Sequence, residues 1–107
     1  MGDSKIRMKS NEVEVLKTLT QTSDERVKTN KREIRNGLDA VLRMKPQMYE
    51  KDGKTHSGFI SQEVNTIDEL KHLVNVPENG NEYQSLNYTG IIAYLVSAIH
   101  ELNKKLS

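Results

Sequence analysis

The sequence contains no cysteine and no tryptophan, and aromatic residues make up only 5% of its 107 residues. The absence of cysteine excludes a disulfide framework and a thiolate metal site. The three histidines, His56, His72 and His100, lie far apart and do not have the spacing of a metal-binding motif. We therefore expect one small domain with a modest core, without a metal ion or another cofactor.

The chain also has little net charge and no long apolar run. Its formal charge is +1, which argues against nucleic acid as the main partner, because phosphate binding depends on a basic excess. No stretch approaches the length of a membrane span, and the N-terminus has no apolar signal segment, so we expect no membrane association. The mean hydropathy of −0.71 suggests that much of the apolar surface is buried between chains.

Residues 1–22 are expected to form one or two strands. Apolar residues alternate loosely with polar ones there, with the period of two that is typical of strands. We interpret residues 1–22 as the end of a β-rich stalk, or as a linker, that belongs to a longer protein. The alternative is a short hairpin of the domain itself.

The middle of the chain is expected to combine short helices with hairpins. The expected elements are a helix over 24–44 in two pieces, strands at 47–50 and 55–60, a short helix that starts at 61 and continues weakly to 70, and strands at 73–76 and 83–88. Asn36-Gly37 is the expected break in the first helix, and Pro46 disfavours helical geometry before it. An Asp-Gly turn at 51–54 joins the first pair of strands.

The C-terminal segment has the clearest helical periodicity. Its apolar residues step by four and three, the a and d spacing of a coiled coil over about three heptads. These seam residues are Tyr88, Ile92, Leu95, Ile99, Leu102 and Leu106. Ile91, Val96 and Ala98 widen the stripe, so one flank is expected to pack on the chain's own domain. The spacing alone favours a two-stranded coil, and a C-terminal core helix is the alternative.

Ser23 and Lys28 are a candidate nucleophile and base. A serine hydroxyl needs a base to take its proton, and a neutral lysine amine can serve as that base. Because the residues are five apart, they lie on opposite faces of a strand and apart around a helix, and can meet only across a turn. The alternative is that Ser23 is a helix N-cap, with Asp24 and Glu25 at the positive end of the helix dipole.

Several motifs become informative because they occur together and in order. They cover residues 23–30, 38–46, 49–50, 56–64, and 88–93 with 98–102. In this arrangement the chain resembles the intramolecular chaperone auto-processing domain, a self-cleaving serine peptidase module at the C-terminus of phage endosialidases, tail fibres and neck appendages. The resemblance covers residues 23–107. Ser61 stands where the family more often has alanine and Lys31 where it often has isoleucine, and neither departure touches Ser23 or Lys28.

The resemblance implies a fold, a partner and an activity. The fold is α+β, a small hairpin and helix domain whose long C-terminal helix forms a trimeric coiled-coil bundle. Such domains trimerise, help the β-rich fibre or enzyme region upstream in the same polypeptide to fold, and then cut themselves off. The cut would fall between Thr22 and Ser23, with Ser23 as nucleophile and Lys28 as general base. The parent protein would belong to a virion tail or appendage, assembled in the host cytoplasm, with this domain released.

Other residues would support the reaction. Arg26, and the Lys28 copies that trimerisation brings together, would disfavour the protonated form of Lys28 by like-charge repulsion. Asn30 or a backbone N–H would supply an oxyanion donor. His56 would support the site or make a structural hydrogen bond in the hairpin, and Asp24 would otherwise be a first-turn helix charge. The same fold without cleavage, and a plain coiled-coil adaptor, are the alternative functions.

Overall fold

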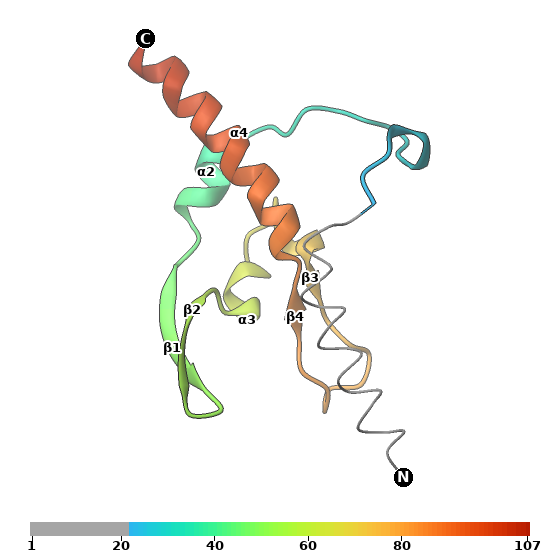
Figure 1. The fold of residues 1–107 in the computed structure, drawn as a ribbon, viewed down its shortest axis with the longest axis vertical. Helices are drawn as coiled ribbons and strands as arrows, with labels where there is room; N and C mark the ends of the chain where they lie inside the picture. Colours follow the sequence, from blue (N-terminus) through green and yellow to red (C-terminus); the bar gives the residue numbers. More distant parts are fainter. Residues whose placement is uncertain (1–21) are drawn as a thin grey trace. The chain divides into compact units, whose positions relative to one another are not determined.

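The computed structural model describes residues 22–107 and divides the chain into two units, Met1–Arg32 and Glu33–Ser107 (Figure 1). The strands expected over residues 1–22 lie outside the described residues, apart from Thr22. Of the first unit, the described part contains one short 3₁₀ helix, η1 (Glu25–Val27). The second unit contains, in chain order, α2 (Gly37–Leu42), β1 (Gln47–Lys51), β2 (Lys54–Gly58), α3 (Ser61–Val64), η2 (Lys71–Leu73), β3 (Val74–Asn75), β4 (Ser85–Leu86) and α4 (Tyr88–Leu106).

The helix expected over 24–44 is wrong for most of its length, since only η1 and α2 are helical. Residues 28–36 between them are rich in charge and lack an apolar face, so burial does not repay the cost of helix formation. Asn30 and Asn36 adopt left-handed backbone angles, with φ of 53° and 58°, which a continuous helix does not tolerate. The break expected at Asn36-Gly37 is the point where α2 begins.

Two small antiparallel sheets and a C-terminal helix make this an α+β fold, as expected. In the first sheet, β1 pairs with β2 so that Tyr49 faces His56. The turn between them has φ of 54° at Asp52 and 74° at Gly53, and this left-handed pair is typical of a tight hairpin turn. The return strand ends at Gly58, two residues earlier than expected.

The second sheet is shorter than the sequence predicted. β3 and β4 share only the pairs Val74 with Leu86 and Asn75 with Ser85. The strand expected to reach Tyr88 ends earlier because the Asn87 side chain accepts a hydrogen bond from the Gly90 N–H at 3.1 Å. This contact caps α4 and fixes its first turn.

The core of the second unit lies between α2, the α3–η2 segment and α4 (Figure 1). Its buried side chains are apolar: Ala40, Met44, Val64, Ile67, Leu70, Leu73 and Ile91. The helix expected to continue from residue 61 to 70 instead ends at Val64, and the following turns bury Ile67 and Leu70. Leu70 has no exposed surface, so it is a central core residue.

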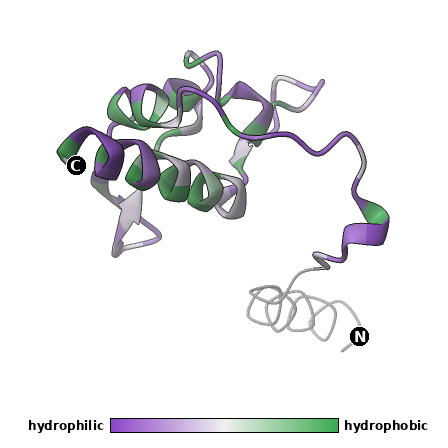
Figure 2. Cartoon of the chain, turned by 90° about the horizontal axis from the view of Figure 1, so that it is seen from above, coloured by the Kyte–Doolittle hydropathy of each residue, from purple (hydrophilic) through white to green (hydrophobic). Residues whose placement is uncertain are grey.

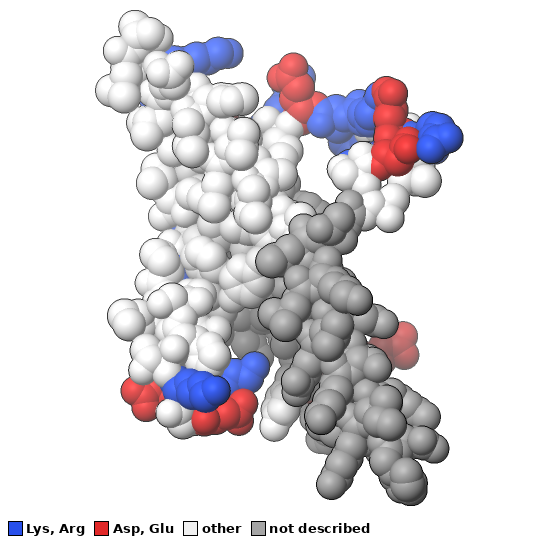
Figure 3. Space-filling view, in the orientation of Figure 1, with Lys and Arg blue, Asp and Glu red and all other residues white. Residues whose placement is uncertain are grey.

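α4 carries two different faces. Ile91 and Ala98 are buried against the domain, as expected for the packed flank. The seam residues are all exposed, from 40% of the surface of Leu95 to 80% of that of Leu106. Val96 was expected on the packed flank but is 47% exposed, because it lies on the other side of the seam. In Figure 2 the ribbon of α4 carries both hydrophobic and hydrophilic residues, and the face of α4 turned to the reader in Figure 3 is largely uncharged.

Candidate active site

The η1 turn brings the predicted nucleophile and base together. The Asp24 side chain accepts a hydrogen bond from the Arg26 backbone N–H at 2.8 Å. The backbone N–H groups of Val27 and Lys28 donate to the carbonyl oxygens of Asp24 and Glu25 at 3.2 and 3.1 Å. The N-cap of this turn is therefore Asp24, and the interpretation of Ser23 as the N-cap is wrong.

Ser23 and Lys28 lie on either side of this turn. The Lys28 ammonium Nζ donates a hydrogen bond to Ser23 Oγ at 2.7 Å. Asp24 and Lys28 both have extended backbone angles, so the chain enters and leaves the turn in a way that returns Lys28 to Ser23. The two side chains meet across a turn, the geometry that their spacing requires.

Ion pairs occupy most other charged groups of the turn. Arg26 Nη2 and Nε contact the Asp24 carboxylate at 2.8 and 3.1 Å, and Lys31 pairs with Glu25. The hydrogen bond from the Arg26 side chain, and then that from its backbone, lower the pKa of Asp24 below its ordinary value. Because Asp24 balances the charge of Arg26, any repulsion between Arg26 and Lys28 is weakened.

Solvent reaches the whole segment, since every described residue of the first unit is exposed. Asn30, the suggested oxyanion donor, has left-handed backbone angles, and its carbonyl oxygen accepts a hydrogen bond from Arg32 at 3.0 Å. Its side-chain amide makes no hydrogen bond to another residue in the range 22–107. The turn thus presents an accessible hydroxyl next to an amine, and the amide of Asn30, just after the turn, has no hydrogen-bond partner among residues 22–107.

Comparison with known families gives a match that includes both Ser23 and Lys28. The sequence model of a peptidase family described as the chaperone of endosialidase matches residues 23–81, more than half of the chain. The chain belongs to this family. No curated protein matches the sequence. The family match confirms the resemblance drawn from the ordered motifs and supports a chaperone-type, peptidase-related domain. A plain coiled-coil adaptor with a coincidental resemblance is excluded.

The match to the chaperone of endosialidase family begins at Ser23, so it includes the η1 turn. It continues through α2, both hairpin strands and α3 to the turn after β3. α4 lies beyond residue 81. The seam of α4 therefore rests on the spacing and the exposure of its own residues.

His56, which the sequence suggested as a supporting residue of the site, lies on β2 in the second unit. Its ring stacks on that of Tyr49, with centroids 6.0 Å apart and planes 18° apart. Of the two roles suggested for His56, the structural hydrogen bond is not found among residues 22–107, where the ring stacks on Tyr49. Burial, and then the neighbouring Tyr88, raise the pKa of Tyr49 above its ordinary value.

Tyr88 has a second role that the sequence did not reveal. Its hydroxyl accepts a hydrogen bond from the Phe59 N–H at 3.2 Å, and its ring lies against that of Phe59, 6.1 Å between centroids. Tyr88 thus ties the start of α4 to the end of the hairpin, although it also counts among the exposed seam residues. The spacing of Tyr88 in the sequence predicted only its place in the seam, because the contact with Phe59 joins residues that are distant in sequence.

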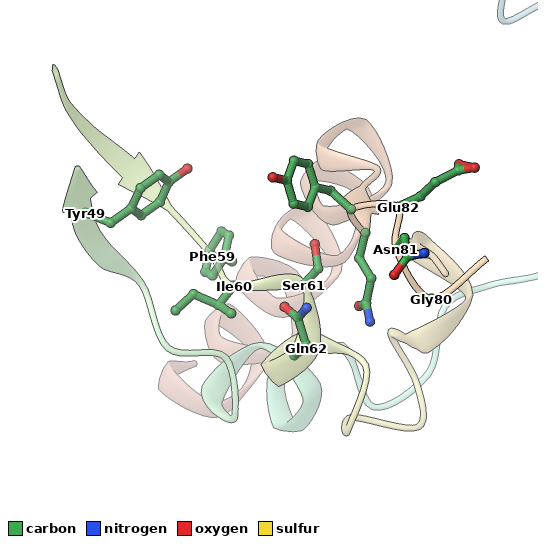
Figure 4. A pocket seen from close by; sticks show the side chains of 10 residues that line it. Tyr49, Phe59, Ile60, Ser61, Gln62, Gly80, Asn81 and Glu82 are labelled. Carbon is green, nitrogen blue, oxygen red and sulfur yellow. The ribbon is translucent and has the colours of Figure 1, made fainter. Parts of the chain in front are cut away.

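The second unit also contains a pocket of about 510 Å³ next to the motif at 56–64. In Figure 4, Tyr49 lies on one side and Asn81 with Glu82 on the other, with residues 59–62 between them. The side-chain oxygen Oε1 of Gln84, which also lines the pocket, is buried without a hydrogen-bond partner among the described residues. The sequence could not predict this pocket, because three separate segments form its wall.

Neither a metal site nor a membrane span is found in the part of the chain that the structure describes. No group of three or more His, Asp or Glu side chains in residues 22–107 is arranged to hold a metal ion. Among the same residues, no helix combines the length and the hydrophobicity of a membrane span.

Proposed function

We propose that this domain is an intramolecular chaperone that trimerises, assists folding of the β-rich region upstream, and releases itself by cutting between Thr22 and Ser23. The observation that carries the cleavage step is the contact between Ser23 Oγ and Lys28 Nζ at 2.7 Å. The start of the family match at Ser23 supports it. The parent would be a tail-fibre or appendage protein of a virion assembled in the host cytoplasm.

The reaction is an acyl transfer followed by hydrolysis. Neutral Lys28 takes the proton of Ser23 Oγ as this oxygen attacks the carbonyl carbon of Thr22. The bond between the Thr22 carbon and the Ser23 nitrogen then breaks, and the leaving nitrogen takes a proton from the Lys28 ammonium. This N-to-O shift leaves an ester between Thr22 and Ser23 Oγ. Water hydrolyses the ester to the Thr22 carboxylate and restores the Ser23 hydroxyl.

Lys28 Nζ and Ser23 Oγ can form a hydrogen bond whether the lysine is protonated or neutral. An ammonium at Lys28 can donate to Ser23 Oγ over the 2.7 Å that separates the two atoms. As a free amine, Lys28 accepts the hydroxyl proton over the same Oγ to Nζ distance, which is within the range required for general base catalysis. The domain would act once, because the bond that it cuts is its own.

The exposed seam of α4 supports trimerisation. Its apolar side chains are exposed at Ile92, Ile99 and Leu106 among others, and a second copy could cover them. The spacing alone favours two strands, whereas the resemblance implies three. We propose the trimer, because packing of the α4 flank on its own domain can change the preferred number of strands. Light scattering should show three chains per particle.

Holding chain ends together would assist folding upstream. Intertwined β-rich fibres depend on contacts distant in sequence, so they fold slowly and expose strand edges while they do so. A C-terminal trimer raises the effective concentration of the three chains. Expression of the parent with and without residues 23–107 tests this role. Soluble, trimeric fibre made without the domain would refute it.

Release after folding would make the fibre kinetically stable. The domain would guide assembly and then be absent when the fibre unfolds. Comparison of cleaved trimers with uncleaved Ser23→Ala trimers after heating tests this. If both refold equally well, release does not trap the fibre.

Intact mass spectrometry of the purified protein over time tests cleavage. We expect a product that begins at Ser23, none from Ser23→Ala, and very slow cutting by Lys28→Arg. Arginine keeps the positive charge and the donors but does not lose its proton, so this variant isolates the base. Lys31→Ala is the matched control and should cut normally. A product with another N-terminus, or normal cutting by Ser23→Ala, contradicts the assignment, and an intact wild-type trimer favours the non-cleaving alternative.

A further inference from the structure

The sequence contains two Asn-Gly pairs, Asn36-Gly37 and Asn79-Gly80. Such pairs are prone to deamidation, because glycine has no Cβ that would hinder the attack of its backbone nitrogen on the preceding side chain. The two pairs are chemically identical, so only their surroundings can make them react at different rates. Gly37 is buried at the start of α2, whereas Gly80 is exposed in the loop between β3 and β4.

The loop leaves the nitrogen of Gly80 open to reaction. Residues 78–83 are all exposed, and a Cβ added at Gly80 would meet no atom within 4 Å. The Gly80 N–H makes no hydrogen bond to another residue in the range 22–107. Asn79 Oδ1 accepts a hydrogen bond from the Asn81 N–H at 3.0 Å, which polarises the side-chain carbonyl. The ring that this bond closes contains both Asn79 Cγ and the Gly80 nitrogen, the two atoms that would react.

The pair Asn36-Gly37 is held against α4. A Cβ at the buried Gly37 would lie only 2.6 Å from Ser97 Oγ. The next N–H along the chain, that of Leu38, donates to Glu101 Oε2 at 2.7 Å. Attack on Asn36 requires the peptide that follows it to rotate toward the side chain. This rotation would pull Gly37 away from α4 and break the bond to Glu101.

We propose that Asn79 is a site of spontaneous deamidation, and that packing on α4 protects Asn36 from the same reaction. The Gly80 nitrogen loses its proton and bonds to Asn79 Cγ, and the side-chain nitrogen leaves as ammonia. Water then opens the succinimide ring. Opening at Cγ gives aspartate, and opening at the main-chain carbonyl gives isoaspartate, in which the chain runs through Cγ. Water is the only co-reactant.

The products would change one wall of the pocket described above. Residues 80–82 lie on one side of this pocket in Figure 4. An acid at position 79 adds a negative charge between Glu78 and Glu82. Isoaspartate also adds the Cβ carbon to the main chain, which would break the bond from the Glu82 N–H to the Asn79 carbonyl oxygen at 3.0 Å. This change belongs to the second unit and does not depend on cleavage at Ser23.

Peptide mapping of the full chain after storage at neutral pH tests the proposal. Trypsin cuts after lysine and arginine, so it leaves Asn36 in peptide 36–43 and Asn79 in peptide 72–104. Mass spectrometry with fragmentation follows the conversion of each asparagine to its acid, and labelling by an isoaspartyl methyltransferase detects isoaspartate. In the folded protein we expect Asn79 to convert at least about tenfold faster than Asn36, which reacts only when α2 opens locally. In guanidinium chloride both should convert at similar rates.

Gly80→Ala is the matched variant. The open space at position 80 accepts a methyl group, so the fold should be kept. The methyl group hinders the attacking nitrogen, and conversion of Asn79 should slow by about tenfold. Equal rates for Asn79 and Asn36 in the folded protein, or an unchanged rate for Asn79 in Gly80→Ala, overturn the proposal. A difference between the two asparagines that persists in guanidinium chloride would refute protection by α4.

Discussion

Asp24 receives hydrogen bonds from both the backbone and the side chain of Arg26, with the shortest at 2.8 Å. These bonds close η1 and leave Ser23 with Lys28 as its partner. Loss of the cap in Asp24→Ala should therefore reduce the population of the turn and slow cleavage about fivefold, as for a typical helix cap. Asp24→Asn keeps the capping oxygen and loses the ion pair, so it should cut nearly normally. Equal slowing of both variants would mean that the charge of Asp24, and not its cap, matters.

Assembly should depend on the exposed face of α4. In Ile99→Asp a carboxylate replaces a seam side chain, and its burial between copies would cost on the order of several kcal/mol. We expect this variant to be monomeric in light scattering at micromolar concentration. His100→Asp places the same charge on the neighbouring exposed position outside the seam and should leave the trimer intact. Dissociation by both substitutions would point to net charge instead of the seam.

Substitution of two leucines, Leu70 and Leu42, should lower the free energy of unfolding by very different amounts. Leu70 has no exposed surface, whereas Leu42 is 73% exposed in the described structure. Leu70→Ala removes a buried side chain and should lower the free energy of unfolding by about 2–5 kcal/mol. The same change at Leu42 should cost far less. Urea unfolding at equal protein concentration measures both, and similar losses would place Leu42 in an interface between copies.

The ion pair between Arg43 and Glu69 should make the stability of the fold depend on pH. Arg43 Nη2 contacts Glu69 Oε1 at 2.5 Å. The Glu69 backbone N–H, and then Arg43, lower the pKa of the Glu69 carboxyl. A lowered folded-state pKa stabilises the fold above the ordinary glutamate range, and this contribution is lost as pH falls through the lowered value.

Arg43→Ala tests this dependence. The variant should have a lower Tm than the wild type at pH 7, by a small amount because the pair is partly exposed to solvent. The difference should shrink as both proteins are taken from about pH 5 to about pH 2.5, where the carboxyl is protonated. A difference in Tm that stays constant would mean that Arg43 stabilises by packing alone.

Local signals in the sequence predicted those elements that local interactions determine. The Asp52-Gly53 turn predicted the first hairpin, and the four-and-three spacing predicted α4 from Tyr88 to Leu106. The helix expected over 24–44 does not form as one piece, because helix propensity alone does not stabilise residues 28–36, which have no apolar face to bury. Two left-handed asparagines, Asn30 and Asn36, interrupt it instead.

The candidate site was only partly open to prediction. The residue types and spacing pointed to Ser23 and Lys28, but their contact depends on the cap at Asp24, which the sequence did not distinguish from one at Ser23. The contact between Leu38 and Glu101 spans most of the described chain, and no periodicity signals it. The same is true of the bond between Tyr88 and Phe59.

Cleavage before Ser23 would give this exposed residue a distinctive chemistry. A cut before this residue turns its nitrogen into a primary amine next to the carbon that carries the hydroxyl. Such a 1,2-amino alcohol is oxidised by mild periodate to an aldehyde, whereas a serine within a chain is not. Because solvent reaches this segment, the aldehyde could be captured by a hydrazide dye without unfolding the protein. Each molecule would then carry at its first residue a label that records whether it has acted.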